Sequence, residues 1–251
     1  MQHQSLPVMF SPSSFVAFVI VLICFGCSTG NKKAEQTPKD DVVRTYDRNK
    51  KLKSEVQMKD GKRHGLAKTY YPNGKLNLEL PYVEDEREGT SKKYYETGLL
   101  FQETDYHDDQ IHGVQKKYDA SGLISEARYE FERPCKGLIE YSKGVKRSDY
   151  PAIVIRPVDR IQIDGSYTIE VSVTYGASKA QFYLGELTSS GCLHNGLFPL
   201  PAGKTRTSAY QRYILHPGQF LMEELNIIAE VTTRSGNTYL TERKFPFSIE
   251  N

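Results

Sequence analysis

The stretch HGLAKTYYPNGKLNLELPY, residues 64–82, places a turn signal, YPNG at residues 71–74, between two short runs. In the second run, residues 75–82, leucines alternate with polar residues. Alternation with a period of two indicates a β-strand with one buried face. A glycine that closes a short loop fits the left-handed position of a hairpin turn. The stretch therefore predicts a β-hairpin.

The same pattern recurs along the chain with a step of 24 residues. Each copy begins at a glycine, has a tyrosine five residues later and closes its turn on a second glycine. A fixed period is typical of repeat arrays, in which each unit buries a face only against its neighbours. The glycines assigned to repeat turns are Gly65, Gly74, Gly89, Gly98, Gly113, Gly122 and Gly137. We expect an elongated antiparallel sheet of hairpins over residues 55–145.

These copies resemble the MORN-variant repeat, which occurs in bacterial proteins that include those labelled YwqK-type antitoxins. The residues that carry the resemblance are 64–74, 88–98 and 112–122. The resemblance implies an elongated β-sheet used for interactions, and it brings no family-wide catalytic residues. An antitoxin would be cytosolic, whereas the N-terminus of this chain predicts export.

The N-terminus has the features of an exported lipoprotein. Residues 15–25 are an unbroken apolar run, which suits a signal peptide and is short for a membrane span. Gly26 and Cys27 then resemble a bacterial lipobox, in which the cysteine is lipidated and becomes the mature N-terminus. Cys24 stands where leucine is usual, and residues 1–14 lack Lys and Arg. We expect a signal peptide at residues 1–26 and a lipid on Cys27; the alternative is an ordinary leader with an incidental cysteine.

Residues 27–54 are rich in Lys, Asp, Asn, Gln and Thr, and we expect them to form a flexible tether. An acidic residue at the second position of a mature lipoprotein is a signal for retention in the inner membrane. Ser28 at that position is not acidic, so we expect the protein to reside in the outer membrane. The chain carries 33 basic and 31 acidic residues, and this balance predicts no nucleic-acid partner.

After a junction at residues 142–151, residues 150–251 follow a different pattern. Short alternating runs separated by turn signals such as Asp164-Gly165 predict an immunoglobulin-like β-sandwich. The chain has no Trp, so the antibody-type Cys-Trp-Cys core is absent. The expected strands are residues 152–156, 160–163, 166–173, 180–187, 208–215, 224–233 and 238–249.

Two cysteines follow Cys27 in the chain, at Cys135 and Cys192. In an oxidising compartment such a pair can form a disulfide. The alternative is two separate buried thiols, since the sequence does not show whether their Cα atoms come within reach of each other.

A search for catalytic and metal motifs favours a protein that is not an enzyme. From residue 31 onward the chain contains no G-x-S-x-G, H-E-x-x-H or C-x-x-C pattern. Residues of metal-ligand type gather on one hairpin connection without the spacing of a zinc or EF-hand site. They are Asp105, His107, Asp108, Asp109 and His112. We expect no catalytic residues, no metal and no cofactor.

One row of tyrosines and one row of lysines are expected to share a face of the repeat sheet. They are Tyr70, Tyr94 and Tyr118, with Lys68, Lys92 and Lys116 two residues earlier. Aromatic rings beside cations could bind a glycan or a protein segment. The alternative is that the tyrosines pack on the sheet and the lysines keep it from associating.

These observations predict an all-β, membrane-anchored envelope lipoprotein that acts as a non-enzymatic interaction or scaffold module with a protein or glycan partner. We expect its repeat sheet and its sandwich to be separable binding modules. The first alternative is a toxin–antitoxin protein. The second is an envelope glycan-acting enzyme, which would need two carboxylates facing one cleft, and the sequence singles out no such pair.

Overall fold

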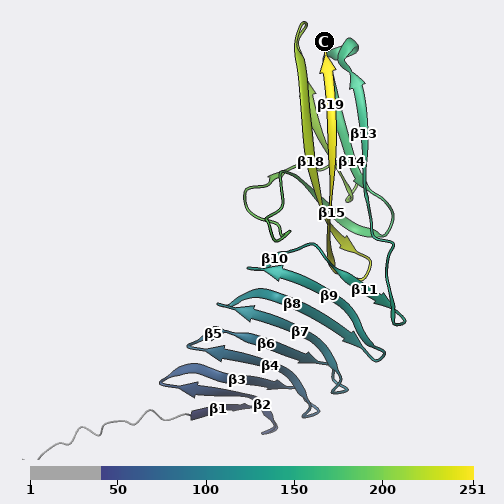
Figure 1. The fold of residues 1–251 in the computed structure, drawn as a ribbon. Helices are drawn as coiled ribbons and strands as arrows, with labels where there is room; N and C mark the ends of the chain where they lie inside the picture. Colours follow the sequence, from purple (N-terminus) through teal and green to yellow (C-terminus); the bar gives the residue numbers. More distant parts are fainter. Residues whose placement is uncertain (1–40) are drawn as a thin grey trace, which may run out of the picture. The chain divides into compact units, whose positions relative to one another are not determined.

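The computed structural model describes residues 41–251; the predicted signal peptide, Cys27 and the first part of the predicted tether lie outside the described residues. The described chain is built almost wholly from β-strands in three sheets (Figure 1). No helix in residues 41–251 is both long and apolar enough to cross a membrane.

The first sheet is a row of antiparallel strands joined by short turns, as the repeat predicts. Its order is β1-β2-β3-β4-β6-β7-β8-β9-β11-β12, with β5 beside β4 and β10 beside β9. Consecutive strands are neighbours because each connection is too short to cross another strand. The strands are β1 (Asp41–Tyr46), β2 (Leu52–Lys59), β3 (Lys62–Tyr70), β4 (Leu76–Val83), β5 (Glu86–Arg87), β6 (Gly89–Tyr94), β7 (Leu100–His107), β8 (Gln110–Asp119), β9 (Gly122–Glu130), β10 (Arg133–Pro134), β11 (Ile139–Ser142) and β12 (Val145–Lys146).

The sheet begins earlier than expected. Residues 41–54, assigned to the flexible tether, contain β1 and the start of β2, so that part of the tether prediction is wrong. These residues are one more copy of the repeat, since Tyr46 stands 24 residues before Tyr70. The copy is hard to recognise because Lys50 replaces the closing glycine and adopts its left-handed conformation, with φ of 62°.

The glycines of the repeat occupy two different kinds of position. Gly74, Gly98 and Gly122 close the hairpin turns with φ of 84°, 92° and 115°. The assignment of Gly65, Gly89 and Gly113 to turns is wrong, because these glycines lie in strands opposite Tyr82, Tyr106 and Tyr129. Gly137 lies between β10 and β11.

Gly65 shows why a strand position needs a glycine. Its φ is 95°, and a Cβ atom there would lie 2.1 Å from Oε1 of Gln57. That oxygen accepts a hydrogen bond from the backbone N–H of Leu66, next to a register shift between β2 and β3. The glycine therefore makes room for a side chain that caps a β-bulge.

The remaining described chain forms two sheets of three and four strands, in the orders β13-β14-β17 and β16-β15-β18-β19. The expected strand at residues 160–163 is wrong, because a helical turn, α1 (Ile161–Asp164), takes its place. The strands are β13 (Ile153–Arg160), β14 (Ser166–Val173), β15 (Ala177–Leu184), β16 (Phe198–Pro199), β17 (Ser208–Ile214), β18 (Phe220–Thr233) and β19 (Thr238–Glu250).

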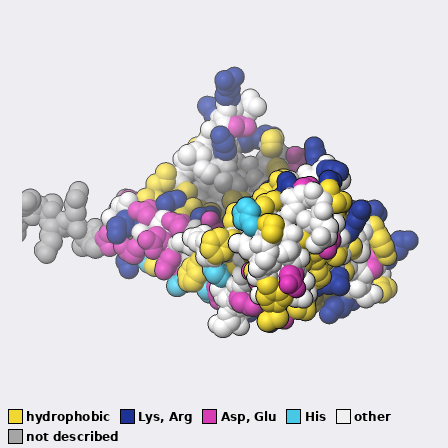
Figure 2. Space-filling view, turned by 90° about the horizontal axis from the view of Figure 1, so that it is seen from above, with side chains coloured by type: hydrophobic (Ala, Val, Ile, Leu, Met, Phe, Trp, Pro, Cys, Tyr) yellow, Lys and Arg dark blue, Asp and Glu magenta, His cyan; other side chains and the backbone are white. Residues whose placement is uncertain are grey.

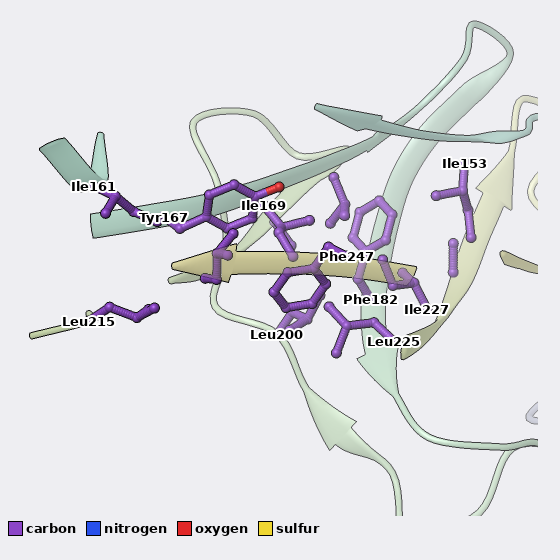
Figure 3. Close-up of a cluster of buried hydrophobic side chains, with 14 of the residues drawn as sticks. Ile153, Ile161, Tyr167, Ile169, Phe182, Leu200, Leu215, Leu225, Ile227 and Phe247 are labelled. Carbon is purple, nitrogen blue, oxygen red and sulfur yellow. The ribbon is translucent and has the colours of Figure 1, made fainter. Parts of the chain in front are cut away.

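These two sheets enclose one apolar core and so form a β-sandwich. Ile169 of β14, Phe182 of β15 and Ile227 of β18 are almost fully buried in it. Figure 3 shows their side chains meeting between strands of both sheets, together with Phe247 of β19. Alternate residues of each strand point inward, as a sandwich requires.

Two joints hold the repeat sheet to the sandwich. Cys135, after β10, forms a disulfide with Cys192, and their Cα atoms lie 3.8 Å apart. Glu140 of β11 is 3% exposed and accepts hydrogen bonds of 2.7 Å from Thr233 and from Asn237. Its other oxygen lies 3.0 Å from Arg147. The two parts belong to one compact unit. That they are separable binding modules stays a prediction.

Candidate functional site

One face of the repeat sheet carries a continuous row of charged residues that alternate in sign across eight strands. Each residue stands directly opposite the next in the strand register. Directly opposed unlike charges stabilise a sheet, and directly opposed like charges destabilise it. We call this row the charge ladder; it consists of Arg44, Glu55, Lys68, Glu79, Lys92, Glu103, Lys116 and Glu126.

The lysines of the candidate binding face, Lys68, Lys92 and Lys116, are therefore members of this ladder. The Nζ atom of Lys68 lies 3.6 Å from Glu79, and that of Lys92 lies 3.9 Å from Glu103. Lys116 stands between Glu103 and Glu126 in the register. The row thus presents alternating charge and no cationic strip.

The tyrosines of the predicted face also make contacts inside the sheet. The hydroxyl of Tyr70 donates to Glu55 over 2.8 Å, and that of Tyr94 donates to Glu79 over 3.0 Å. The hydroxyl of Tyr118 donates to Glu103 over 2.7 Å. The pKa of Tyr118 is raised to about 12, mainly by burial and secondly by this hydrogen bond. These tyrosines hold the ladder glutamates in place, as the packing interpretation expects.

A second set of contacts links neighbouring repeats at the edge where the strands turn. Oδ1 of Asp85 accepts hydrogen bonds from the backbone N–H of Arg63 over 2.9 Å and from its Nε over 3.0 Å. The Arg63 guanidinium also lies over the ring of Tyr82, 4.2 Å from its centre. One repeat later, Arg87, Asp109 and Tyr106 make the same contacts.

These Arg–Asp contacts, which were not expected from the sequence, lie at two-residue turns. Asp85 and Asp109 each follow another acidic residue, and both residues of each pair have positive φ. Asp tolerates this conformation better than most residues. The signal was available, since Arg63 and Asp85 recur as Arg87 and Asp109 at the repeat step of 24.

The cluster of metal-ligand types contacts protein groups in the structure. Asp109 binds Arg87, and Asp105 accepts hydrogen bonds from Thr90 and from the backbone of Val114. His107 and Asp108 lie in a separate, exposed group. Its third member is Glu88, which was not among the residues expected from the sequence. In it, His107 lies 3.0 Å from Glu88 and 3.7 Å from Asp108. The pKa of His107 is raised, and the main cause is its hydrogen bond to Glu88. When protonated, His107 forms ion pairs with both carboxylates.

The surface charge is mixed as well as balanced. Figure 2 shows acidic and basic side chains interspersed on the face seen from above. Such a surface does not generate the field of one sign that draws nucleic acid. The prediction that no nucleic acid binds rests on this balance.

Comparison with protein families supports the repeat assignment. Residues 42–60, 63–84 and 87–108 match the MORN repeat variant. No curated protein matches the chain. The first matched copy lies largely in the predicted tether, and the copy expected at residues 113–129 is not matched.

The structure explains why the repeat signal weakens after residue 108. At the next step Ile111 replaces the arginine of the Arg–Asp contact, and Phe131-Glu132 replaces the acidic pair. The backbone contact persists, because Glu132 N–H donates to the carbonyl of Ile111 over 2.8 Å. The hairpin geometry is therefore kept while the side-chain pattern is lost. Residues 42–108 are three consecutive MORN-variant repeats in an antiparallel β-sheet.

Proposed function

We propose that this protein is a lipid-anchored scaffold of the bacterial envelope, in which the repeat sheet is a stiff interaction platform and catalyses no reaction. The observation that carries the proposal is the charge ladder with its tyrosines. The tyrosine of each repeat donates to a glutamate of the preceding repeat, and the lysine of each repeat pairs with a glutamate of its own hairpin. Side chains fixed in this way hold the strands in register and stiffen the platform.

The position of the sheet in the chain fits this role. β1 follows the predicted lipidation site, Cys27, by 14 residues. At about 4.8 Å per strand, the eight steps from β1 to β11 extend for about 40 Å. A protein or a glycan is the expected partner.

The disulfide supports an exported location. Disulfides persist in oxidising compartments and are rare in the cytosol. The bond between Cys135 and Cys192 fixes the junction of the repeat sheet and the sandwich. A protein secreted by the predicted leader would be able to form it.

Metabolic fatty-acid labelling tests the anchor, with Cys27→Ala as the variant and Cys24→Ala as the matched control. We expect wild type and Cys24→Ala to be labelled and to fractionate with membranes, and Cys27→Ala to be neither. Equal labelling of all three would refute the lipid anchor. Affinity capture from envelope extracts with the whole lipidated chain would then identify the partner. Hydrolysis of an envelope glycan by the purified chain, lost on changing one carboxylate, would instead make it an enzyme.

A further inference from the structure

The charge ladder ends at an edge strand. β1 pairs with β2 on one side, and no strand of the described residues pairs with its other side. Arg44 begins the ladder here, and its Nε lies 3.4 Å from Glu55 of β2. Val42 and Val43 are 42% and 50% exposed on this strand. An exposed edge strand with apolar residues is a template for pairing with another extended chain.

The repeat shows what the missing neighbour should contain. β1 is the equivalent of β3, because Arg44 stands 24 residues before Lys68. Lys68 lies between two glutamates, Glu55 of β2 and Glu79 of β4. Among residues 41–251, Arg44 faces a glutamate on one side only. The strand that would complete the pattern carries a carboxylate opposite Arg44.

The sequence before β1 does not repeat the pattern of this strand. One repeat step before β2 lie residues 28–35, STGNKKAE, with Asn31 in the place of Glu55. This stretch also lacks the alternating apolar residues of β2 and β4. The pattern of a returning strand is therefore absent from the sequence that precedes β1.

A second copy of β1 fits the pattern less well than a strand of another protein. In a two-fold antiparallel pair, opposed residues point to the same face in both copies, so their numbers differ by an even amount. Arg44 would then meet Asp40, Val42, Arg44 or Tyr46 of the other copy and never Asp41. Only Asp40 supplies a carboxylate, and that register sets Tyr46 against Pro38, which has no backbone N–H to donate. Val42 and Tyr46 leave the ladder incomplete, and Arg44 against Arg44 opposes like charges.

We propose that the outer edge of β1 binds an extended segment of a partner protein that adds as an antiparallel strand and places an Asp or Glu opposite Arg44. Backbone hydrogen bonds to the edge supply affinity that does not depend on sequence, and the ladder selects the charge. The inference rests on the proposed interaction role of the repeat sheet and names the kind of protein partner for it.

A charge-swap binding experiment tests the edge site. The probe is a fluorescent peptide with the sequence of residues 52–59, LKSEVQMK, the returning strand that this sheet places against β3. A second peptide has lysine in place of its glutamate. We expect the purified full chain to prefer the glutamate peptide about three- to tenfold by fluorescence anisotropy, because the pair changes from attractive to repulsive. Arg44→Glu should reverse the preference, and Arg44→Gln should abolish it.

Arg48→Glu is the matched control, since it makes the same charge change four residues away in the turn after β1. It should leave the preference for the glutamate peptide intact. Absence of binding by both peptides, or the same preference in wild type and Arg44→Glu, would overturn the proposal. A shift in Arg48→Glu as large as that in Arg44→Glu would also overturn it, because long-range charge would then be the cause.

The two proposals fail separately. Peptide binding by a chain that carries no lipid would leave the edge site standing and reject the anchor. A labelled chain that binds neither peptide would reject the edge site and leave the anchored role standing.

Discussion

The repeat sheet and the sandwich are stabilised in different ways. No hydrophobic side chain in residues 41–126 is fully buried, whereas the sandwich buries Ile169, Ile227 and Phe182 almost completely. The repeat sheet instead relies on contacts between neighbouring copies, such as the charge ladder and the Arg–Asp pairs. A sandwich core is shared by all of its strands, while a repeat contacts only the next repeat.

The difference matters for function. Polar and charged contacts on an exposed sheet are each weak, but a repeating set of them fixes the register of every strand. Such a sheet can be lengthened by another strand without disturbing a core. A strand added to the sandwich would also have to fit its inward side chains into a closed core. This difference is the reason for proposing that a partner binds the repeat sheet.

The largest expected difference between the two regions is in the response to truncation of an apolar side chain. Ile227→Ala should lower the free energy of unfolding by about 2–5 kcal/mol, because it opens a cavity in the sandwich core. Leu78→Ala, on the half-exposed sheet, should cost roughly 1 kcal/mol. Chemical denaturation under oxidising conditions measures both. Equal losses would show that the repeat sheet has a core of its own.

A turn substitution should affect the repeat sheet by an intermediate amount. Gly98 has φ of 92°, which strains a β-branched residue, so Gly98→Val should cost about 1–3 kcal/mol. Glu96→Ala, an exposed change in the same turn, is the matched control and should stay within about 0.5 kcal/mol of wild type. If thermal melts of the two variants coincide, the left-handed glycine is not required.

The smallest expected effect is the pH dependence of one Arg–Asp contact. Hydrogen bonds from the backbone N–H of Arg87 and then from its guanidinium lower the pKa of Asp109 below 3.8. The folded state therefore binds the proton less tightly than the unfolded state. The resulting stability is present above pH 3.8 and is lost as the pH falls through the folded-state pKa.

Melting temperatures measured from pH 7 to pH 2 test this contact with Asp109→Asn. The variant should melt slightly below wild type at pH 7, and the two curves should converge at the acid end. The effect is small because the pair is exposed to solvent. A difference that persists unchanged at pH 2 would mean that the carboxylate charge is not its source.

Periodicity made the repeat sheet predictable. The leucines of β4 and the glycines that close the turns specify hairpins locally, and a fixed step places the hairpins side by side. The charge ladder was not predicted, because it depends on the register between strands. The lysines alone suggested a cationic strip, and only the opposed glutamates show that the charge is balanced.

The errors have physical causes. The first repeat was assigned to the tether because Lys50 adopts the conformation that the other copies give to glycine. The helical turn at α1 was mistaken for a strand because Ile161 and Ile163 alternate with polar residues over too short a span to distinguish the two. The contacts of Glu140 with the sandwich were not predicted. They join residues about a hundred positions apart in the chain, and a local sequence pattern carries no information on such contacts.

Hydrogen exchange of Gly98→Val tests most directly whether the repeat sheet is held together by contacts between neighbours. The account predicts that the substitution speeds exchange in β6 and β7 and in the strands toward the free edge, β1 to β4. Exchange in β13 to β19 should remain at the wild-type rate, because the sandwich has its own core. An equal increase in all three sheets would contradict the account, since the chain would then unfold as one cooperative core.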